Sequence, residues 1–186
     1  SFPTRRSSDL CALQAVGATF IRDVKPGEIL IFSKDGVTSR KEHCGRKKEQ
    51  FCIFEYIYFA RPDSVINGIS VHEARARAGR ILAKTHPVNA DIVIGVPYSG
   101  LDAALGYSQQ SNIPYEIGLI KNKYIGRTFI MPGQAVRKRS VRQKLNTIGA
   151  EFKGKNVLLV DDSIVRGTTC CEIIQMVREA GANKVM

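Results

Sequence analysis

The sequence predicts an α/β fold in which a parallel sheet is flanked by helices. Apolar, β-branched segments alternate with segments of helical length, and short connections join them. Segment 156–160, NVLLV, is almost entirely apolar, which is typical of a central strand covered on both faces. A chain of 186 residues can bury one substantial core. We therefore expect one main domain.

The individual elements are predicted from side-chain periodicity and from start and stop signals. Over residues 51–59, bulky side chains alternate as in a strand. The first long helix opens with a capping box, in which Ser70 is the N-cap and Glu73 follows three residues later. The last helix is expected to stop at Gly181. The predicted elements are, in order, strands at 29–32 and 51–59, a helix at 70–84, a strand at 91–96, a helix at 101–110, strands at 115–120 and 156–160, a helix at 169–180, and the start of a strand at 184–186.

Two adjacent carboxylates, Asp161 and Asp162, follow the apolar strand at its carboxyl end, where open α/β sheets bind their ligands. Neighbouring carboxylates repel and are costly to desolvate, so they need a divalent cation, a sugar diol or a cationic side chain. The next residues supply hydroxyl groups, a glycine and the N–H groups that open a helix, which suits an anion. The simpler alternative is an Asx turn followed by an ordinary helix cap. The loop residues are Ser163, Ile164, Val165, Arg166, Gly167, Thr168 and Thr169.

The segment VLLVDDSIVRGTT, residues 157–169, resembles the phosphoribosyl pyrophosphate (PRPP) signature of type I phosphoribosyltransferases. The resemblance implies a type I phosphoribosyltransferase fold. It also implies that Asp161 and Asp162 hold the ribose hydroxyls or a metal ion, Mg²⁺, and that residues 163–169 wrap the 5′-phosphate. A Walker A loop is excluded because its spacing is absent.

Two further segments narrow the resemblance. CIFEYIYFARPDS at 52–64 and KNKYIGRTFIMPGQ at 121–134 stand in the order found in the glutamine PRPP amidotransferase family. The chain resembles that family from about Cys11 to its last residue. The implied reaction is a glycosyl transfer, in which ammonia from glutamine replaces the pyrophosphate of PRPP to give 5-phosphoribosylamine. This is the first step of de novo purine biosynthesis.

The resemblance also divides the chain. Residues 1–10, SFPTRRSSDL, do not fit the family and are expected to be a non-native leader. Residues 11–45 are similar to the C-terminal remnant of an N-terminal-nucleophile glutaminase domain, and 46–186 to a phosphoribosyltransferase domain that is truncated at its C-terminus. We expect such a fragment to be inactive alone.

The residues expected to bind the pyrophosphate group of PRPP are also assigned by resemblance. Ser99, in a turn after the 91–96 strand, is expected to contribute to pyrophosphate and metal binding, although Tyr98 stands where the family usually has an acidic residue. Lys121, Tyr124 and Arg127 are expected to clamp pyrophosphate from a lid over the site and to exclude water. The following basic segment, 137–145, is predicted to be helical. It is either a solvated basic face or a site for nucleotide phosphates.

The five cysteines are an odd number without CxxC spacing, which indicates a reducing cytoplasm rather than a disulfide scaffold. Some members of the family carry a [4Fe–4S] cluster, and Cys52 matches its first ligand, with the other ligands expected beyond Met186. Relatives without a cluster also have cysteine there, so both alternatives stay open. The three histidines are predicted to have no catalytic role.

The net charge of +11 raises the alternative of a nucleic-acid-binding module. Aromatic residues do not interleave with the basic segment as single-strand binding requires, and no zinc-finger or helix-turn-helix signature occurs, so we expect no nucleic-acid partner. No apolar run approaches the ~20 residues that span a bilayer, so we expect no membrane partner either. Another type I phosphoribosyltransferase or a PRPP-sensing regulator stays open as an alternative. The family further implies purine nucleotide inhibitors and a homo-oligomer at full length.

Overall fold

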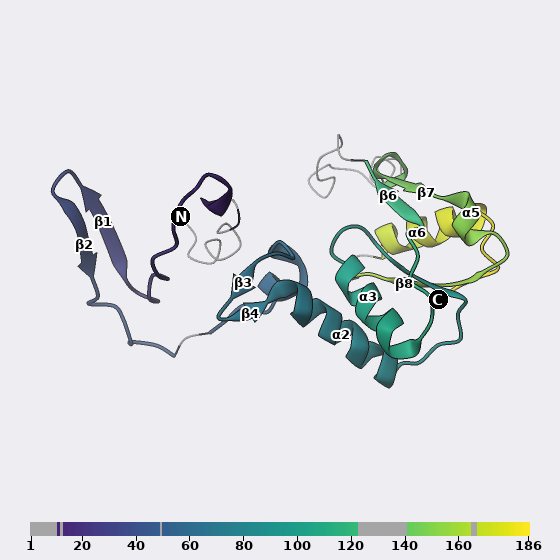
Figure 1. Ribbon diagram of the computed structural model, residues 1–186, viewed down its shortest axis with the longest axis horizontal. Coiled ribbons are helices and arrows are strands. Elements are labelled where there is room, and N and C mark those ends of the chain that lie inside the picture. Colours follow the sequence, from purple (N-terminus) through teal and green to yellow (C-terminus); the bar gives the residue numbers. More distant parts are fainter. Residues whose placement is uncertain (1–10, 12, 49, 123–140, 165–166) are drawn as a thin grey trace. The chain divides into compact units, whose positions relative to one another are not determined.

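The computed structural model describes residues 11, 13–48, 50–122, 141–164 and 167–186 (Figure 1). The chain forms two compact units, Ser1–Val71 and His72–Met186. The domain boundary predicted between residues 45 and 46 lies inside the first unit. It stays a prediction, because compactness alone does not define a family domain.

The first unit contains an antiparallel hairpin of β1 (Ile29–Ser33) and β2 (Gly36–Arg40), which lies at the far left of Figure 1. The prediction of a strand at 29–32 is confirmed. The partner strand was not predicted, since its GVTSR sequence has no apolar alternation. The tight turn needs Gly36, whose φ of +125° disfavours residues with a side chain.

The strand predicted at 51–59 is wrong, because residues 55–59 form a π-helix, η2 (Glu55–Phe59). The N–H group of Ala60 donates to the carbonyl five residues earlier at 3.0 Å, which is the π-helical pattern. Aromatic side chains five residues apart consequently meet. The ring centroids of Phe54, the N-cap, and Phe59, the last residue of the turn, lie 6.5 Å apart. The alternation of bulky residues fitted a strand, whereas the five-residue spacing of the aromatic rings fits this wider turn.

A short hairpin of β3 (Val65–Ile66) and β4 (Ile69–Ser70) follows η2. The hydroxyl group of Tyr56 donates to the carbonyl of Ile66 at 2.7 Å and ties the π-helix to this hairpin. Ala60, Ile66 and Val71 form a small buried cluster beneath it.

The second unit is built around a parallel sheet, as predicted. Within the described residues, β5 (Ile92–Gly95), β8 (Asn156–Val160) and β9 (Lys184–Val185) pair in the order β5-β8-β9. All of their pairings are parallel, with Gly95 opposite Val160. The strands predicted at 91–96, 156–160 and 184–186 are confirmed within a residue or two.

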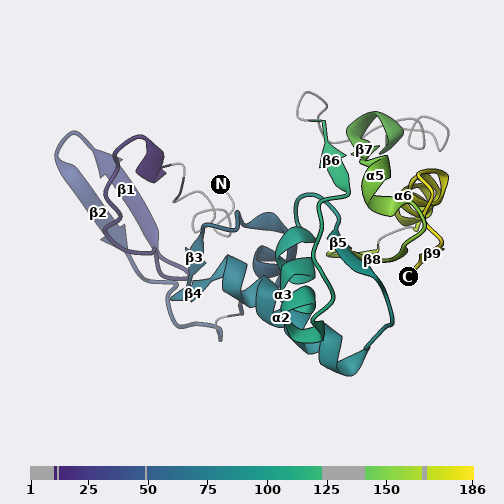
Figure 2. The same cartoon turned by 45° about the vertical axis from the view of Figure 1, so that its right-hand side comes forward.

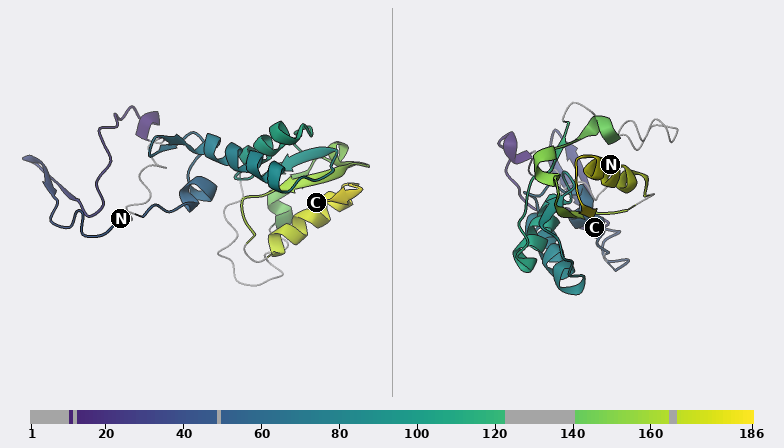
Figure 3. Two further views of the ribbon diagram at one scale, coloured as in Figure 1. Left: turned by 90° about the horizontal axis from the view of Figure 1, so that it is seen from below. Right: turned by 90° about the vertical axis from the view of Figure 1, so that its right-hand side faces the viewer.

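Helices cover both faces of this sheet, which explains its apolar strands (Figure 2, Figure 3). α2 (Val71–Thr85) and α3 (Leu101–Ser111) lie on the side to which Val93 points, and α5 (Gly149–Phe152) and α6 (Thr168–Glu179) lie on the side of Ile94. The helices predicted at 70–84, 101–110 and 169–180 correspond to α2, α3 and α6. Within the described residues, no helix combines the length and the apolar character needed to cross a membrane.

The strand predicted at 115–120 is confirmed only in part. Tyr115 forms a single parallel bridge to Val93, and the chain then leaves the sheet. β6 (Leu119–Lys121) pairs instead with the antiparallel β7 (Leu145–Thr147), which was not predicted. Residues 141–144 are helical, so the helix predicted at 137–145 is confirmed there and stops where β7 begins; 137–140 lie outside the described residues.

α2 and α3 pack backbone to backbone, because glycines line their contact. A Cβ atom on Gly79 would collide with the backbone of Ala103, and one on Gly106 with the backbone of Ala76. This close packing holds the middle of α2 against the first half of α3.

Candidate functional site

The candidate site lies at the carboxyl edge of the parallel sheet, where β5 and β8 end together. The N–H group of Val96 donates to the carbonyl of Val160 at 2.9 Å, one residue beyond the strand pairing. The turn after β5 then folds back against the same point. A Cβ atom on Gly100 would collide with the Val160 carbonyl oxygen, so only glycine permits this approach. The turn that carries Ser99 and the strand end that carries Asp161 therefore meet at one edge.

The two aspartates hold each other in a defined arrangement. The N–H group of Asp162 donates to Oδ1 of Asp161 at 2.9 Å, and the Ser163 hydroxyl donates to Oδ1 of Asp162 at 2.8 Å. Oδ2 of Asp162 is buried and has no hydrogen-bond partner within the described residues. A buried carboxylate oxygen without a donor is costly, so this atom is suited to receive a ligand.

The surroundings of the Asp161 carboxyl group disfavour its ionised form. Its pKa is raised from the ordinary value of 3.8 to about 6, chiefly by desolvation and also by the like charge of Asp162, against the lowering effect of the Asp162 N–H group. The residue nevertheless keeps exposed surface, so solvent screens part of this effect. A cation or hydrogen-bond donor placed here would stabilise the ionised carboxylate.

The loop behind the aspartates leads into α6 through a glycine. Gly167 is the N-cap of the helix with a φ of +69°, a conformation that favours glycine. Because glycine has no side chain, this cap does not cover the N–H groups of the first turn, where Thr168 and Thr169 lie, and such a helix start suits an anion. Ser163 and Ile164 are exposed, as an open loop requires. Val165 and Arg166 lie outside the described residues.

Of the three residues predicted to clamp pyrophosphate, only Lys121 lies within the described residues. Its Nζ atom lies 4.7 Å from the centroid of the Tyr98 ring, a cation–π geometry. Tyr98 follows a cis peptide bond in the turn that carries Ser99, so Lys121 is held beside that turn. Burial and the positive charge of Lys121 lower the pKa of Lys144, which indicates two cations close together. Tyr124 and Arg127 lie outside the described residues.

Sequence reasoning missed a charged cluster at the starts of α2 and α3. His72 Nδ1 lies 2.9 Å from Oδ1 of Asp102, and Arg75 Nη1 lies 3.7 Å from Oδ2 of the same carboxylate. Arg75 is only 6% exposed, which is unusual for an arginine. The expectation that the histidines have no catalytic role stays a prediction, although His72 has a carboxylate partner in the fold. The two partners are 30 residues apart, and only the three-residue spacing of His72 and Arg75 on one helix face hinted at a cluster.

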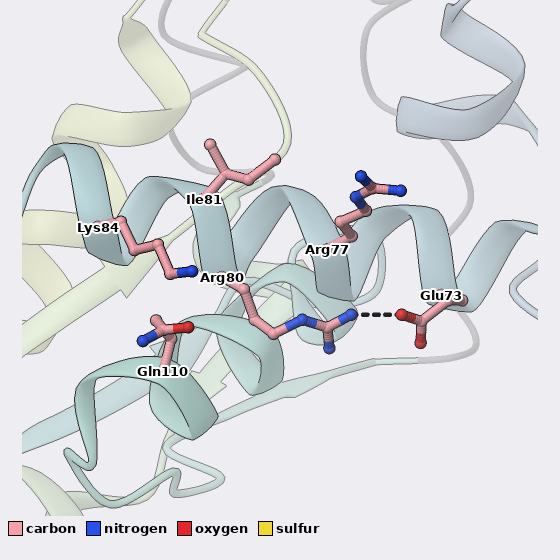
Figure 4. A pocket seen from close by; sticks show the side chains of 6 residues that line it. All are labelled: Glu73, Arg77, Arg80, Ile81, Lys84 and Gln110. Carbon is pink, nitrogen blue, oxygen red and sulfur yellow. Dashed lines mark hydrogen bonds and ion pairs between the residues drawn. The ribbon is translucent and has the colours of Figure 1, made fainter.

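A shallow basic groove of about 410 Å³ lies elsewhere, along α2 and the end of α3 (Figure 4). Arg80 forms an ion pair with Glu73, and Arg77 points away from both, so the cations do not converge on one ligand position. The groove includes neither the acid pair nor the loop before α6. We therefore do not place the ligand site there. Its lining residues are Glu73, Arg77, Arg80, Ile81, Lys84 and Gln110.

Metal-binding groups can be compared with the two predicted cofactors. The hard carboxylate oxygens of Asp161 and Asp162 fit Mg²⁺, which takes only one or two carboxylates and completes its shell with water and phosphate. Within the described residues, no three His, Cys, Asp or Glu side chains gather as a metal site. Cys52 is exposed, and a [4Fe–4S] cluster needs four cysteine ligands, so the described residues do not form that site.

Known proteins share much of this sequence. Residues 67–186 match the model of the phosphoribosyl transferase domain family. The chain is 54% identical over 178 residues to an amidophosphoribosyltransferase of Archaeoglobus fulgidus, which covers 96% of this chain and 39% of the relative. It is 51% identical over 179 residues to the Bacillus subtilis enzyme of the same name, covering 96% of this chain and 37% of the relative.

Solved structures give the same result. Glutamine PRPP amidotransferase from B. subtilis, complexed with ADP and GMP, superposes with a TM-score of 0.78 at 52% identity. That match covers 94% of this chain and 38% of the solved chain. The chain thus spans about two fifths of the length of the relatives it matches.

Proposed function

Since this chain belongs to the phosphoribosyltransferase family, with a type I phosphoribosyltransferase fold, we propose that it is the PRPP-binding part of a glutamine-dependent amidophosphoribosyltransferase. The observation that carries the proposal is the arrangement at the end of β8. There a carboxylate pair with a buried, unpartnered Asp162 oxygen precedes a glycine-capped helix start. A phosphorylated sugar with two hydroxyl groups satisfies both features at once.

The parts of the ligand are assigned to different residues of the site. The ribose hydroxyls donate to Asp161 and Asp162, which need donors or a cation. The 5′-phosphate lies in the loop 163–169, where the first N–H groups of α6 and the threonine hydroxyls can donate to it. Residues Val165 and Arg166 belong to this loop by resemblance.

Mg²⁺ is the cofactor that fits these donors. Asp161 and Asp162 would hold it, with the hydroxyl group of Ser99 at the facing turn. When bound, the ion would neutralise negative charge on the departing pyrophosphate. The [4Fe–4S] cluster, with Cys52 as one ligand, stays a proposal drawn from the family resemblance alone.

The remaining residues act on the reaction at ribose C1. Displacement of pyrophosphate by ammonia passes through a transition state with positive charge at the sugar ring and growing negative charge on the leaving group, by analogy with glycoside cleavage. Lys121, held over the Tyr98 ring, is placed to attract that leaving group. Tyr124 and Arg127 share this role by resemblance. Closure of their segment would keep water from competing with ammonia.

The wider context follows the named relatives. We propose that ammonia comes from a glutaminase domain, of which residues 11–45 are the end, and that the whole protein is a cytoplasmic homo-oligomer of purine biosynthesis. The solved B. subtilis relative was complexed with ADP and GMP, which supports purine nucleotides as inhibitors of the whole protein.

Calorimetric titration of the chain with PRPP tests the proposal. We expect binding that requires Mg²⁺, and at least about a tenfold loss of affinity in Asp162→Asn, since a buried carboxylate loses its charge. Asp35→Asn, on the exposed hairpin turn of the first unit, is the matched control and should bind normally. Unchanged affinity in Asp162→Asn would contradict the proposal, and displacement of PRPP by an oligonucleotide would favour the nucleic-acid alternative.

Turnover separates an enzyme from a PRPP sensor. In the complete protein from which this segment derives, ammonia and PRPP should give 5-phosphoribosylamine without glutamine. Binding of PRPP without any turnover would favour the regulator.

A further inference from the structure

Lys121 lies on the inward-facing side of the hairpin of β6 and β7. Side chains alternate between the two faces of a strand, so Lys121 shares its face of β6 with Leu119, which is 3% exposed. Leu145, its partner across the hairpin, is buried as well, whereas Ile120 on the opposite face is 48% exposed. A lysine in such a position runs its methylene groups along apolar side chains and carries its ammonium group out to water.

Hydrogen bonds beyond the strand pairing hold this hairpin in place. The N–H group of Asn122 donates to the carbonyl of Lys144 at 2.6 Å, and the N–H group of Ile148 donates to the carbonyl of Gly118 at 2.8 Å. These bonds extend the pairing of β6 and β7 at both ends. Residues of both strands also belong to the core cluster of the parallel sheet. The backbone of Lys121 is therefore fixed, while its long side chain keeps rotamer freedom.

The ring of Tyr98 is the contact that limits this freedom. Nζ of Lys121 lies 4.7 Å from the ring centroid, inside the range of about 6 Å for a cation–π interaction. The turn beneath the ring is fixed in its turn, because the N–H group of Gly100 donates to the carbonyl of Val96 at 3.0 Å and that of Leu101 to the carbonyl of Tyr98 at 3.4 Å. Tyr98 is 49% exposed, so burial in the core explains little of its placement.

The chemistry of this contact leaves the lysine charge available to a ligand. An aromatic face attracts an ammonium ion through its quadrupole and does not neutralise it. A carboxylate in the same place would compete with an anionic ligand for the N–H donors. A lysine that is already held has also lost part of the rotamer freedom that binding would otherwise remove. Tyr98 and Lys121 together thus present an ordered cation beside the turn that carries Ser99.

We propose that Tyr98 is a positioning residue for the pyrophosphate group: its ring holds the Lys121 ammonium group at the turn that carries Ser99 before the ligand arrives. The inference rests on the proposed function, because that function places pyrophosphate at this turn. Tyr98 acts through Lys121, and its phenol hydroxyl group has no part in the effect. The competing role is structural, in which the ring only stabilises the turn.

A double-mutant cycle distinguishes these roles. In calorimetric titration of the chain with PRPP and Mg²⁺, Tyr98→Leu should lower the affinity about fivefold, since it removes the ring and keeps most of the bulk. Tyr98→Phe keeps the ring and should bind within about twofold of the unmodified chain. When Lys121 is already Met, Tyr98→Leu should change the affinity by less than about twofold. Phe32→Leu, which removes an exposed ring from the hairpin of the first unit, is the control and should bind normally.

Parts of the ligand separate the two ends of the site. Tyr98→Leu should lower the affinity for inorganic pyrophosphate with Mg²⁺ about fivefold and leave that for ribose 5-phosphate within about twofold. The proposal is overturned by equal losses for both ligands, by a loss that persists with Lys121→Met, or by equal losses in Tyr98→Phe and Tyr98→Leu. A chain that binds pyrophosphate in the expected way but not PRPP would refute the proposed function and leave this inference standing. Binding of neither would overturn both.

A second measurement needs no ligand. Protons above an aromatic ring are shifted upfield in NMR spectra by the ring current. The Hε protons of Lys121 should therefore resonate further upfield in the unmodified chain and in Tyr98→Phe than in Tyr98→Leu. Equal chemical shifts in all three would overturn the proposal, because the ring would then not hold the lysine in solution. Should Tyr98→Leu fail to fold, Tyr98→Met takes its place in every comparison.

Discussion

Substitution of Asp161 by Asn is expected to have opposite effects on stability and on ligand binding. The pKa of Asp161 rises from 3.8 to about 6 in the folded chain, chiefly by desolvation. A carboxyl group that binds its proton more tightly in the folded state opposes folding once it is ionised. Asn keeps an oxygen that accepts the Asp162 N–H bond, so the substitution removes the charge and little else.

The magnitude follows from that pKa. A difference of about two units corresponds to about 3 kcal/mol, since one unit is about 1.4 kcal/mol. Asp161 keeps exposed surface, and solvent screening reduces the expected gain to about 1 kcal/mol. The penalty is absent below the unfolded pKa of 3.8, grows as the pH rises toward 6 and is constant above it. At pH 4.5 about a third of the full effect is expected.

Urea unfolding, monitored by circular dichroism at several pH values, measures this difference. The chain has no tryptophan, and its long helices give the main signal. Asp161→Asn should stabilise the chain at pH 7.5 and weaken PRPP binding there at least about tenfold. The exposed substitution Asp35→Asn should change stability by less than about 0.5 kcal/mol at every pH. A neutral or destabilising effect at pH 7.5, or a gain independent of pH, would refute the reasoning.

Substitutions at three other positions test the backbone and the lysine contact, with Gly149→Ala as the shared control, because a Cβ atom there meets nothing within 4 Å. Gly167→Ala should lower the free energy of unfolding by about 1–2 kcal/mol, because its φ is +69°. It should also lower the affinity for PRPP about tenfold, as measured by calorimetry. An affinity equal to that of the control would contradict the role of the α6 start in anion binding. Gly79→Ala should cost about 1–3 kcal/mol in urea unfolding, since its Cβ collides with the α3 backbone, and an unchanged midpoint would mean that the helices separate easily. Tyr98→Ala should lower the free energy of unfolding by up to about 1 kcal/mol. Tyr98→Phe keeps the aromatic ring next to Lys121 and should leave stability unchanged. Equal losses of stability in both variants would argue against the cation–π contact.

Most of the parallel sheet and its helices could be predicted, because their signals are local. The run NVLLV, the capping residues before α2 and Gly181 after α6 each mark an element within a few residues. The π-helix at Glu55–Phe59 could not be predicted by the same means. Alternating bulky residues are compatible with a strand, and the contacts of Tyr56 with Ile66 and with the cluster around Ala60 form only in the folded chain.

The candidate site also has a part that the sequence predicts and a part that it does not. The acid pair and the glycine before α6 lie within seven residues of each other in the sequence, so their type and spacing allow the prediction of a site for an anion and a cation. The cluster of His72, Arg75 and Asp102 depends on how two helices pack, which no local pattern encodes. Its clearest physical mark, a buried arginine, exists only in the folded chain.

The tyrosine beneath Lys121 has a consequence for how the site responds to salt. An aromatic face attracts an ammonium group without neutralising it, whereas a carboxylate would cancel most of its field. Within the described residues, the Lys121 ammonium group beside the Ser99 turn rests on an aromatic ring, so its positive charge stays available to incoming polyanions. Association of a highly charged ligand should be accelerated at low ionic strength and slowed steeply as salt is added.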